Sequence, residues 1–134
     1  MEFLTQHDFA RLSNPGVVSE QLLSPHNSAS ARVTITRVTI LPGAAQPRHR
    51  HLQSEQIWIA LSGAGELKLA DGQKRTFRAG EVARFADGDV HGFRNTGAAP
   101  FIYLSVTAPP IDFSYAYETQ ESAERVGAEL NPAG

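Results

Sequence analysis

Turn-forming residues recur about every eight to twelve residues along this chain, between short runs that are rich in β-branched side chains. The turns include Pro42-Gly43, Asp71-Gly72, Asp87-Gly88 and the segment from Gly97 to Pro100. Strands linked by short turns at this spacing are typical of all-β sandwiches and barrels, whereas parallel sheets need a long connection, usually a helix, between strands. The spacing therefore predicts an all-β fold for the 134-residue chain, which is most simply one domain.

Within this pattern, the sequence RVTITRVTIL has the clearest strand character. Its apolar residues are odd-numbered at Val33 and Ile35 but even-numbered at Val38 and Ile40. Side chains alternate between the two faces of a strand, so this change predicts a bulge or a switch of face near Arg37. The later sequences EVARF, VHGFRN and PFIYLSVT predict further strands.

Other local patterns predict a hairpin and two short terminal elements. The sequence GELKLADGQKRTFRAG predicts a β-hairpin, because its Asp-Gly pair suits a two-residue turn with positive φ angles. TQHDFARL predicts one or two helical turns capped by Thr5. In DFSYAY, the alternating Phe113, Tyr115 and Tyr117 predict a strand that packs on the barrel or on a partner subunit. The polar sequence that follows predicts a surface helix or a frayed terminus.

The composition restricts the kinds of site that the chain can build. It contains no cysteine, so disulfides, zinc fingers and iron–sulfur clusters are excluded, and any metal must be bound by nitrogen and oxygen ligands. The formal net charge is −2 without a basic stripe, so nucleic-acid binding is not expected. No apolar run has the length of a signal peptide or a membrane span, so we expect a cytoplasmic protein without a membrane partner.

Two of the five histidines, His49 and His51, lie one residue apart in the stretch GAAQPRHRHLQSEQIWIALSG. Residues two apart in an extended strand point to the same face, about 6.6 Å apart at a rise of ~3.3 Å per residue. The two imidazoles are therefore expected to converge, with Glu55 and Gln56 close behind them in the sequence. On an exposed strand such histidines are ordinarily solvated, so the pair alone does not define a metal site.

A second stretch, GEVARFADGDVHGFRN, places His91 after a tight Asp-Gly turn. Together the two stretches resemble the paired motifs of the cupin superfamily, small single-domain proteins with an RmlC-like jelly roll. By strand count the resemblance extends beyond the motifs to about Val106. Ala86 stands where the family usually has proline, which should loosen the turn without changing the ligands. The positions in register are Gly43, His49, His51, Gln56 and Gly63, followed by Gly80, Ala86, Gly88, His91 and Asn95.

The resemblance implies a fold and a cofactor. The fold would be a double-stranded β-helix, or jelly-roll barrel, over residues 31–107. Residues 1–30 would form an N-terminal extension with the first strand, and residues 108–134 a C-terminal extension. Cupins bind one metal ion inside the barrel, so the implied cofactor is one divalent ion of Mn, Fe, Ni, Co or Zn. The implied ligands are His49, His51, Gln56 and His91.

The sequence leaves two alternatives for the oxygen ligand. Family spacing places Gln56 at the usual glutamate position, and a glutamine carbonyl oxygen can bind a metal. Strand parity favours Glu55, which shares a face with the aliphatic residues Ile57, Ile59 and Leu61. We favour Gln56, because a cupin strand can be apolar on both faces when a partner subunit covers the outer one.

Further residues are candidates for the cavity wall because of the faces that they share with the proposed ligands. Trp58 lies on the face of Gln56, and Phe93 and Asn95 lie on the face of His91. The complete candidate set is Trp58, Phe93, Asn95 and Tyr103.

Four arginines near the motifs could bind a substrate carboxylate, since guanidinium groups bind it bidentately. Arg50 and Arg94 alternate with the proposed ligands and should point away from the metal. His7 and His26 lie outside both motifs and are expected at the surface. The four arginines are Arg48, Arg50, Arg84 and Arg94.

These features lead to two hypotheses for function. A divalent ion bound by three neutral imidazoles and an amide would leave the site with a charge of about +2. Such a site would attract an anionic, oxygen-rich small molecule. The first hypothesis is a mononuclear metal enzyme of dioxygenase, isomerase or lyase type. The alternative is a non-catalytic small-molecule-binding or sensor cupin. Acid–base candidates are few, namely Glu55, Tyr103 and His26.

The sequence also predicts a homodimer. The apolar face of Ile57, Ile59 and Leu61, together with the aromatic row from Phe113 to Tyr117, offers enough apolar surface for a subunit interface.

Overall fold

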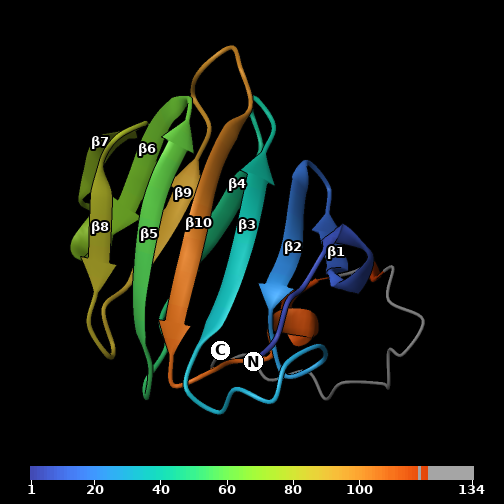
Figure 1. The fold of residues 1–134 in the computed structure, drawn as a ribbon. Coiled ribbons are helices and arrows are strands. Elements are labelled where there is room, and N and C mark those ends of the chain that lie inside the picture. Colours follow the sequence, from blue (N-terminus) through green and yellow to red (C-terminus); the bar gives the residue numbers. More distant parts are fainter. Residues whose placement is uncertain (118, 121–134) are drawn as a thin grey trace.

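The computed structural model describes residues 1–117 and 119–120, which form two antiparallel β-sheets and three short 3-10 helices (Figure 1). The larger sheet has seven strands in the order β11-β1-β2-β3-β10-β5-β8, and the smaller has four in the order β4-β9-β6-β7. The two sheets lie face to face, which confirms the predicted double-stranded β-helix (Figure 1). No helix among the described residues has the length and apolar character needed to cross a bilayer.

The bounds of the elements follow the chain order. The strands of the larger sheet are β1 (Ala10–Asn14), β2 (Val17–Leu23), β3 (Thr34–Ile40), β5 (Glu55–Ser62), β8 (Val82–Phe85), β10 (Phe101–Ala108) and β11 (Thr119–Gln120). The strands of the smaller sheet are β4 (Ala45–His49), β6 (Ala64–Leu69), β7 (Lys74–Arg78) and β9 (His91–Arg94). The 3-10 helices are η1 (Gln6–Asp8), η2 (Ala70–Gly72) and η3 (Phe113–Ala116).

One half of the space between the sheets is a conventional apolar core. Aromatic rings dominate it, as in the stacked pair of Phe93 and Phe101, whose ring centroids lie 4.2 Å apart. Both rings are fully buried, and each side chain of this size contributes about 1.5–3 kcal/mol on burial. The core residues are Val17, Val38, Ile40, Trp58, Ala60, Leu67, Phe77, Phe85, Phe93, Phe101 and Tyr103.

The other half of the inner face of the larger sheet is polar. Cross-strand pairs join Gln21 to Thr36 and Thr36 to Ser105, and the next row joins Thr107 to Gln56. These side chains are all buried. Hydroxyl and amide groups cannot form an apolar core, so this end of the sandwich is suited to bind polar groups. It is the end at which the histidines lie.

Strand β3 does not contain the predicted bulge near Arg37. Its burial alternates without interruption, and its pairing with β10 is continuous from Thr34 to Ile40. The prediction was wrong because it assumed that apolar residues mark the inner face, whereas Thr34 and Thr36 occupy the polar half of that face. The register irregularity lies instead on the neighbouring strand β2, between Gln21 and Leu23.

Two predicted local structures are confirmed. Strands β6 and β7 form the hairpin, with φ angles of 58° at Asp71 and 72° at Gly72. A hydrogen bond of 3.1 Å from the Gln73 N–H to the Ala70 carbonyl closes this turn. Thr5 caps the short helix η1, and its backbone N–H donates in return to the carboxylate at the third helical position.

The sequence predicts a strand for the aromatic row after β10, but these residues do not form one. Phe113 to Ala116 form the 3-10 helix η3, because the Asp112 side chain accepts a hydrogen bond from the Ser114 N–H and so caps a turn. In Figure 1, η3 is the orange coil beside the end of β2. The predicted helical or frayed tail lies outside the described residues.

Candidate metal centre

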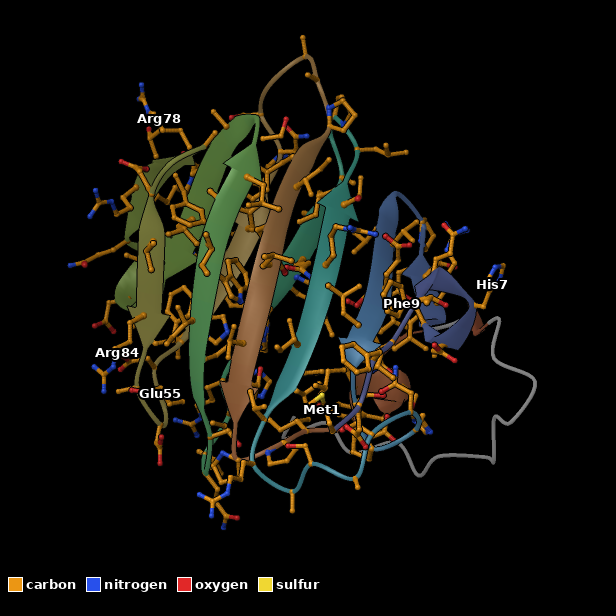
Figure 2. The ribbon with its side chains drawn as sticks, viewed as in Figure 1. Met1, His7, Phe9, Glu55, Arg78 and Arg84 are labelled. Atoms are coloured by element: carbon orange, nitrogen blue, oxygen red, sulfur yellow. The ribbon has the colours of Figure 1, made fainter. Side chains whose placement is uncertain are left out.

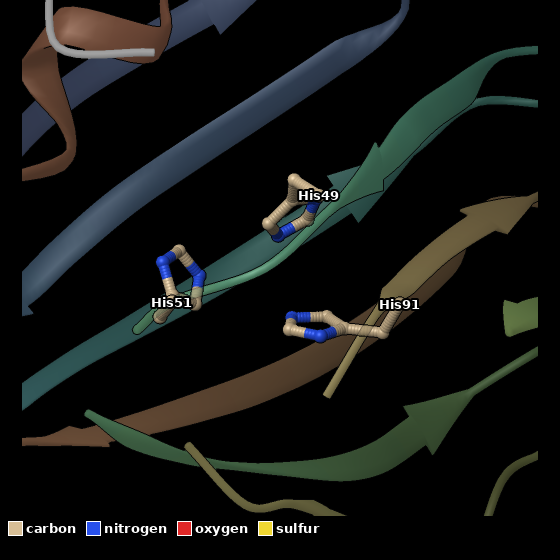
Figure 3. A group of neighbouring side chains, drawn as sticks. All are labelled: His49, His51 and His91. Carbon is tan, nitrogen blue, oxygen red and sulfur yellow. The ribbon is translucent and has the colours of Figure 1, made fainter. Parts of the chain in front are cut away.

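Three histidines meet in the polar half of the sandwich, although they come from two distant segments (Figure 3). His49 ends β4, His51 follows two residues later, and His91 begins β9 as the direct cross-strand partner of His49. Their ring centroids are 5.0 Å (His49–His51), 4.4 Å (His49–His91) and 5.5 Å (His51–His91) apart. Each ring offers a nitrogen within 4.8 Å of the others, so the three histidines could together hold a metal ion.

Backbone carbonyls orient two of these rings. The Nδ1 atom of His49 lies 2.9 Å from the carbonyl oxygen of Pro47, and that of His91 lies 2.9 Å from the carbonyl oxygen of Asp89. A carbonyl can only accept, so Nδ1 carries the proton in each neutral ring and Nε2 keeps its lone pair. This arrangement is the usual support of a metal-binding histidine.

The Gln56 carboxamide completes the cluster. Its Oε1 atom lies 2.7 Å from Nε2 of His91, and its Nε2 atom donates to the Thr107 hydroxyl oxygen at 3.0 Å. The oxygen therefore faces a ring nitrogen that also carries a lone pair. Neighbouring ligand atoms on a six-coordinate ion with bonds of about 2.1 Å lie about 3 Å apart, so the two atoms are spaced like ligands of one cation.

Glu55 points in the opposite direction. It lies on the outer face of β5, where its carboxylate pairs with the Arg84 guanidinium (Figure 2). Gln56 is buried, with 4% of its surface exposed. The inner face of β5 therefore presents the carboxamide to the histidines, and the aliphatic face with Ile57 and Ile59 is the outer one.

Burial governs the protonation of the histidines. Burial, reinforced by the nearby His49 ring, lowers the pKa of His51 to about 4, although the neighbouring Gln56 amide opposes this shift. For His91, burial and the His49 ring lower the pKa to about 3 against the effect of the Asp89 carbonyl. Burial also lowers the pKa of His49. All three rings are neutral at pH 7, which is the form that binds a metal.

A cavity of about 520 Å³ opens onto the cluster, which is within the range of small-molecule sites. His49, His51 and Gln56 lie in its wall. The remaining wall consists of aromatic, aliphatic and neutral polar residues, namely Asn14, Val17, Ser19, Thr36, Val38, Ala45, Gln46, Pro47, Trp58, Tyr103, Ser105, Phe113, Tyr115, Ala116 and Tyr117.

The predicted wall residues fall into two groups. Trp58 and Tyr103 line the cavity, and the Tyr103 hydroxyl donates to Oε1 of Gln46 at 2.9 Å. Phe93 lies instead in the apolar core. Asn95 lines no part of the described cavity wall, because its amide donates to the carbonyls of Ile40 and Ala99 and closes a loop. Phe93 and Asn95 lie on the same face of the chain as His91. The chain runs from the histidine cluster into the core over these residues, so the shared face does not keep them at the cavity.

Sequence reasoning missed the aromatic wall formed by η3. Phe113 contacts His51 edge-to-face, with ring centroids 5.6 Å apart, and Tyr115 and Tyr117 extend this wall. Burial raises the pKa of Tyr117, while hydrogen bonds with Ser19 and Gln46 oppose this shift. Asp112 could have indicated this wall from the sequence, because an aspartate that caps a turn folds the aromatic row back toward the cavity.

The other charged candidates lie away from the cavity wall. The Arg48 guanidinium donates to the Leu69 carbonyl at 2.9 Å, and Arg50, Arg84 and Arg94 are exposed. His7 and His26 are exposed as predicted, and Nε2 of His26 lies 3.2 Å from the Asp112 carboxylate. None of these residues lines the described cavity.

The fold and the cluster define a small β-sandwich of the double-stranded β-helix class with three converging histidines between its sheets. The chain belongs to the cupin family, since the family model Cupin_2 (Cupin domain) matches residues 36–107. An uncharacterized protein of Methanocaldococcus jannaschii, MJ1618, is 25% identical over 84% of this chain and 86% of its own length.

Solved structures share this fold. KdgF from Halomonas sp. superposes with a TM-score of 0.71 at 20% identity, covering 84% of this chain and 96% of its own. A Thermotoga maritima protein described as a predicted oxalate decarboxylase superposes with a TM-score of 0.67 at 24% identity, covering 80% of this chain and 98% of its own. At these identities the likeness shows a shared fold.

Proposed function

We propose that His49, His51, His91 and Gln56 bind one divalent metal ion and that the metal binds a small molecule in the adjoining cavity. The observation that carries this proposal is the pairing of Gln56 Oε1 with Nε2 of His91, 2.7 Å apart. The carbonyl of Asp89 holds the proton on the other ring nitrogen, so two lone pairs face each other. A shared cation relieves the repulsion between them.

The favoured activity is that of a mononuclear metal enzyme acting on an oxygen-containing small molecule. A bound divalent ion would polarise a substrate oxygen as a Lewis acid, or activate O2 if the ion is iron. The protein itself contributes few acid–base groups. Glu55 and His26 are paired outside the cavity, and burial raises the pKa of Tyr103 above its ordinary value, so this phenol can donate a hydrogen bond but does not ionise readily.

The scarcity of acid–base groups favours reactions in which the metal and the substrate supply the chemistry, such as an oxygenation or an enolisation without a protein carboxylate. It also supports the second candidate function, a metal-bearing binding or sensor protein without turnover. The two are separated by incubating metal-loaded protein with a bound ligand, with and without O2, and measuring ligand consumption. Stoichiometric recovery of the unchanged ligand would favour the binding protein.

Metal binding is tested on untagged protein by elemental analysis and by titration with Co(II) or Zn(II). We expect about one ion per chain and its loss in His49→Ala and His91→Ala. The matched control is His7→Ala, since His7 is an exposed histidine on η1. Full metal content in both ligand variants would contradict the proposal.

We also propose that the outer face of β5 and β10 forms a homodimer interface. The cross-strand pairs Ile57–Val106 and Ile59–Leu104 place apolar side chains side by side on this face. A second copy would cover the patch by a two-fold axis, which pairs like with like. Sedimentation at micromolar concentration should show a dimer that Ile59→Lys dissociates. The aromatic row from Phe113 to Tyr117, which the sequence also assigned to this interface, lines the cavity.

A further inference from the structure

The cavity wall carries no aspartate, glutamate, lysine or arginine among the residues that the structure describes. Two charged residues of the first motif have partners outside the cavity, Arg48 with the Leu69 carbonyl and Glu55 with Arg84, and the third, Arg50, is exposed. A buried ionic group without a partner is strongly disfavoured. The proposed metal, at about +2 with its neutral ligands, compensates an anionic group bound to it, whereas an anionic group elsewhere in the cavity would face no cationic side chain of the described wall.

The wall is instead built of flat apolar surfaces. The rings of Trp58 and Tyr103 stack at 4.2 Å with an interplanar angle of 30°, and they form one side. Phe113 and Tyr115 of η3, with Tyr117 directly after it, form another. Aromatic faces separated by a cavity favour a planar ring as the occupant, because ring stacking adds to the gain from apolar burial.

Besides the ring nitrogens of the proposed metal ligand His51, two buried polar atoms in this wall lack a hydrogen-bond partner within the described part of the chain: Nε1 of Trp58 and Oγ of Ser105. The two residues are direct cross-strand partners on β5 and β10 and are 1% and 3% exposed. Indole N–H is a donor only, so it requires an acceptor from the occupant of the cavity. The Trp58 ring also lies 5.4 Å from the His91 ring, so this acceptor would lie close to the metal centre.

From these observations we infer that the ligand is a planar, ring-containing molecule with at most one negative charge. One oxygen binds at the histidine cluster, a second acceptor takes the hydrogen bonds of Trp58 and Ser105, and the apolar ring lies against the aromatic wall. This inference rests on the proposed metal site. In place of the anionic, oxygen-rich ligand expected from the sequence, it favours a molecule with an ortho-hydroxy carbonyl or similar group on an apolar ring. Dicarboxylates and phosphate esters are disfavoured.

The test uses three probes that share one benzene ring and differ in charge: ortho-hydroxyacetophenone, salicylate and phthalate. Each is titrated into the full-length protein loaded with Co(II), and binding is followed by calorimetry and by the visible spectrum of the metal. We expect the neutral and singly charged probes to bind at least tenfold more tightly than phthalate. Phthalate binding that equals or exceeds theirs, or no binding by any probe, would overturn the inference.

The metal content of the same samples separates the two proposals. If Co(II) does not bind, the proposed function fails. If Co(II) binds and phthalate is preferred, only the ligand inference fails.

Two variants test the polar contact. Ser105→Ala and Trp58→Phe should each weaken ortho-hydroxyacetophenone binding by about three- to tenfold while leaving the Co(II) content unchanged. Ser62→Ala, at an exposed position at the end of β5, is the matched control and should have no effect. If Trp58→Phe does not fold, Ser105→Ala alone decides. Unchanged affinity in Ser105→Ala would contradict the role of this pair.

Discussion

The carbonyl oxygen of Gln56 lies 2.7 Å from Nε2 of His91, and both atoms are hydrogen-bond acceptors when the ring is neutral. Two further contacts fix this arrangement, since Gln56 donates to Thr107 and the Asp89 carbonyl faces Nδ1 of His91. Burial lowers the pKa of His91 to about 3, so the ring does not resolve the contact by taking up a second proton at pH 7. These contacts therefore hold two lone pairs in position to bind one cation.

Substitution of Gln56 tests this arrangement directly. Gln56→Leu removes the oxygen, and we expect the affinity for Co(II) or Zn(II) to fall at least tenfold. Gln56→Glu keeps an oxygen ligand and adds a negative charge beside the cation, so the affinity should rise. Competition with a chromophoric chelator measures both effects.

The neighbouring Glu55→Gln is the matched control, because Glu55 pairs with Arg84 on the outer face. A similar loss of affinity in Glu55→Gln and Gln56→Leu would show that the oxygen of Gln56 is not a ligand.

The choice between these two residues illustrates what strand parity can and cannot decide. Both faces of β5 carry apolar side chains, with Trp58 and Ala60 on the inner face and Ile57 and Ile59 on the outer one. Alternation alone then fixes which residues share a face, but not which face is buried between the sheets. Motif spacing gave the correct orientation for Gln56, because it depends on the whole loop and strand rather than on hydrophobicity.

The polar half of the sandwich misled the same reasoning in β3. Thr34 and Thr36 face inward beside the cavity, so a rule that places apolar residues inside predicted a bulge that the strand does not have. The cavity wall from η3 was also missed, because Phe113 meets His51 only after the chain folds back from β10. The wall of a functional cavity does not follow the rule that apolar residues face inward, so hydrophobic patterns in the sequence are least informative there.

The metal-free protein should lose stability as the pH falls from about 6.5 toward about 4. In the unfolded chain the histidines titrate near pH 6.5, whereas in the folded chain the pKa is about 4 for His51 and about 3 for His91. Between these limits the unfolded state binds more protons, so the free energy of unfolding rises with pH. Each histidine contributes at most about 1.4 kcal/mol per pH unit.

Urea unfolding in the presence of EDTA at several pH values measures this slope. His91→Phe should make it shallower, whereas His7→Gln, on exposed η1, should leave it unchanged. An unfolding free energy that is constant between pH 4 and 6.5 would contradict burial of neutral rings.

Gly65 on β6 allows strand β9 to approach closely, because glycine has no Cβ atom. A Cβ atom at this position would lie 2.2 Å from Cζ of Phe93 and 2.6 Å from the Arg94 carbonyl oxygen. Gly65→Ala must therefore push strand β9 away, and overpacking of this kind costs about 1–3 kcal/mol. In Gly97→Ala the nearest atom, the Ala64 carbonyl oxygen, would lie 3.2 Å away, so the cost should be smaller. Chemical unfolding of both variants tests this difference, and equal stabilities would contradict it.

Asp112 holds the aromatic wall over the cavity. One carboxylate oxygen accepts a hydrogen bond of 3.0 Å from the Ser114 N–H, and the other lies 3.2 Å from Nε2 of His26. Asp112→Ala removes the cap of η3, and loss of a cap costs about 1 kcal/mol. We therefore expect hydrogen exchange in residues 113–117 to become about fivefold faster, while the metal content stays unchanged.

The control for this prediction is Asp87→Ala, because Asp87 is an exposed aspartate in the turn before β9. His26→Gln should have a smaller effect than Asp112→Ala, since it leaves the cap in place and can still donate a hydrogen bond to the carboxylate. If exchange in Asp112→Ala matched that of the unsubstituted protein, η3 would be held by its aromatic contacts alone. Phe113 against His51 would then be the contact to remove, and the cavity wall would not depend on the contact between His26 and Asp112 at its edge.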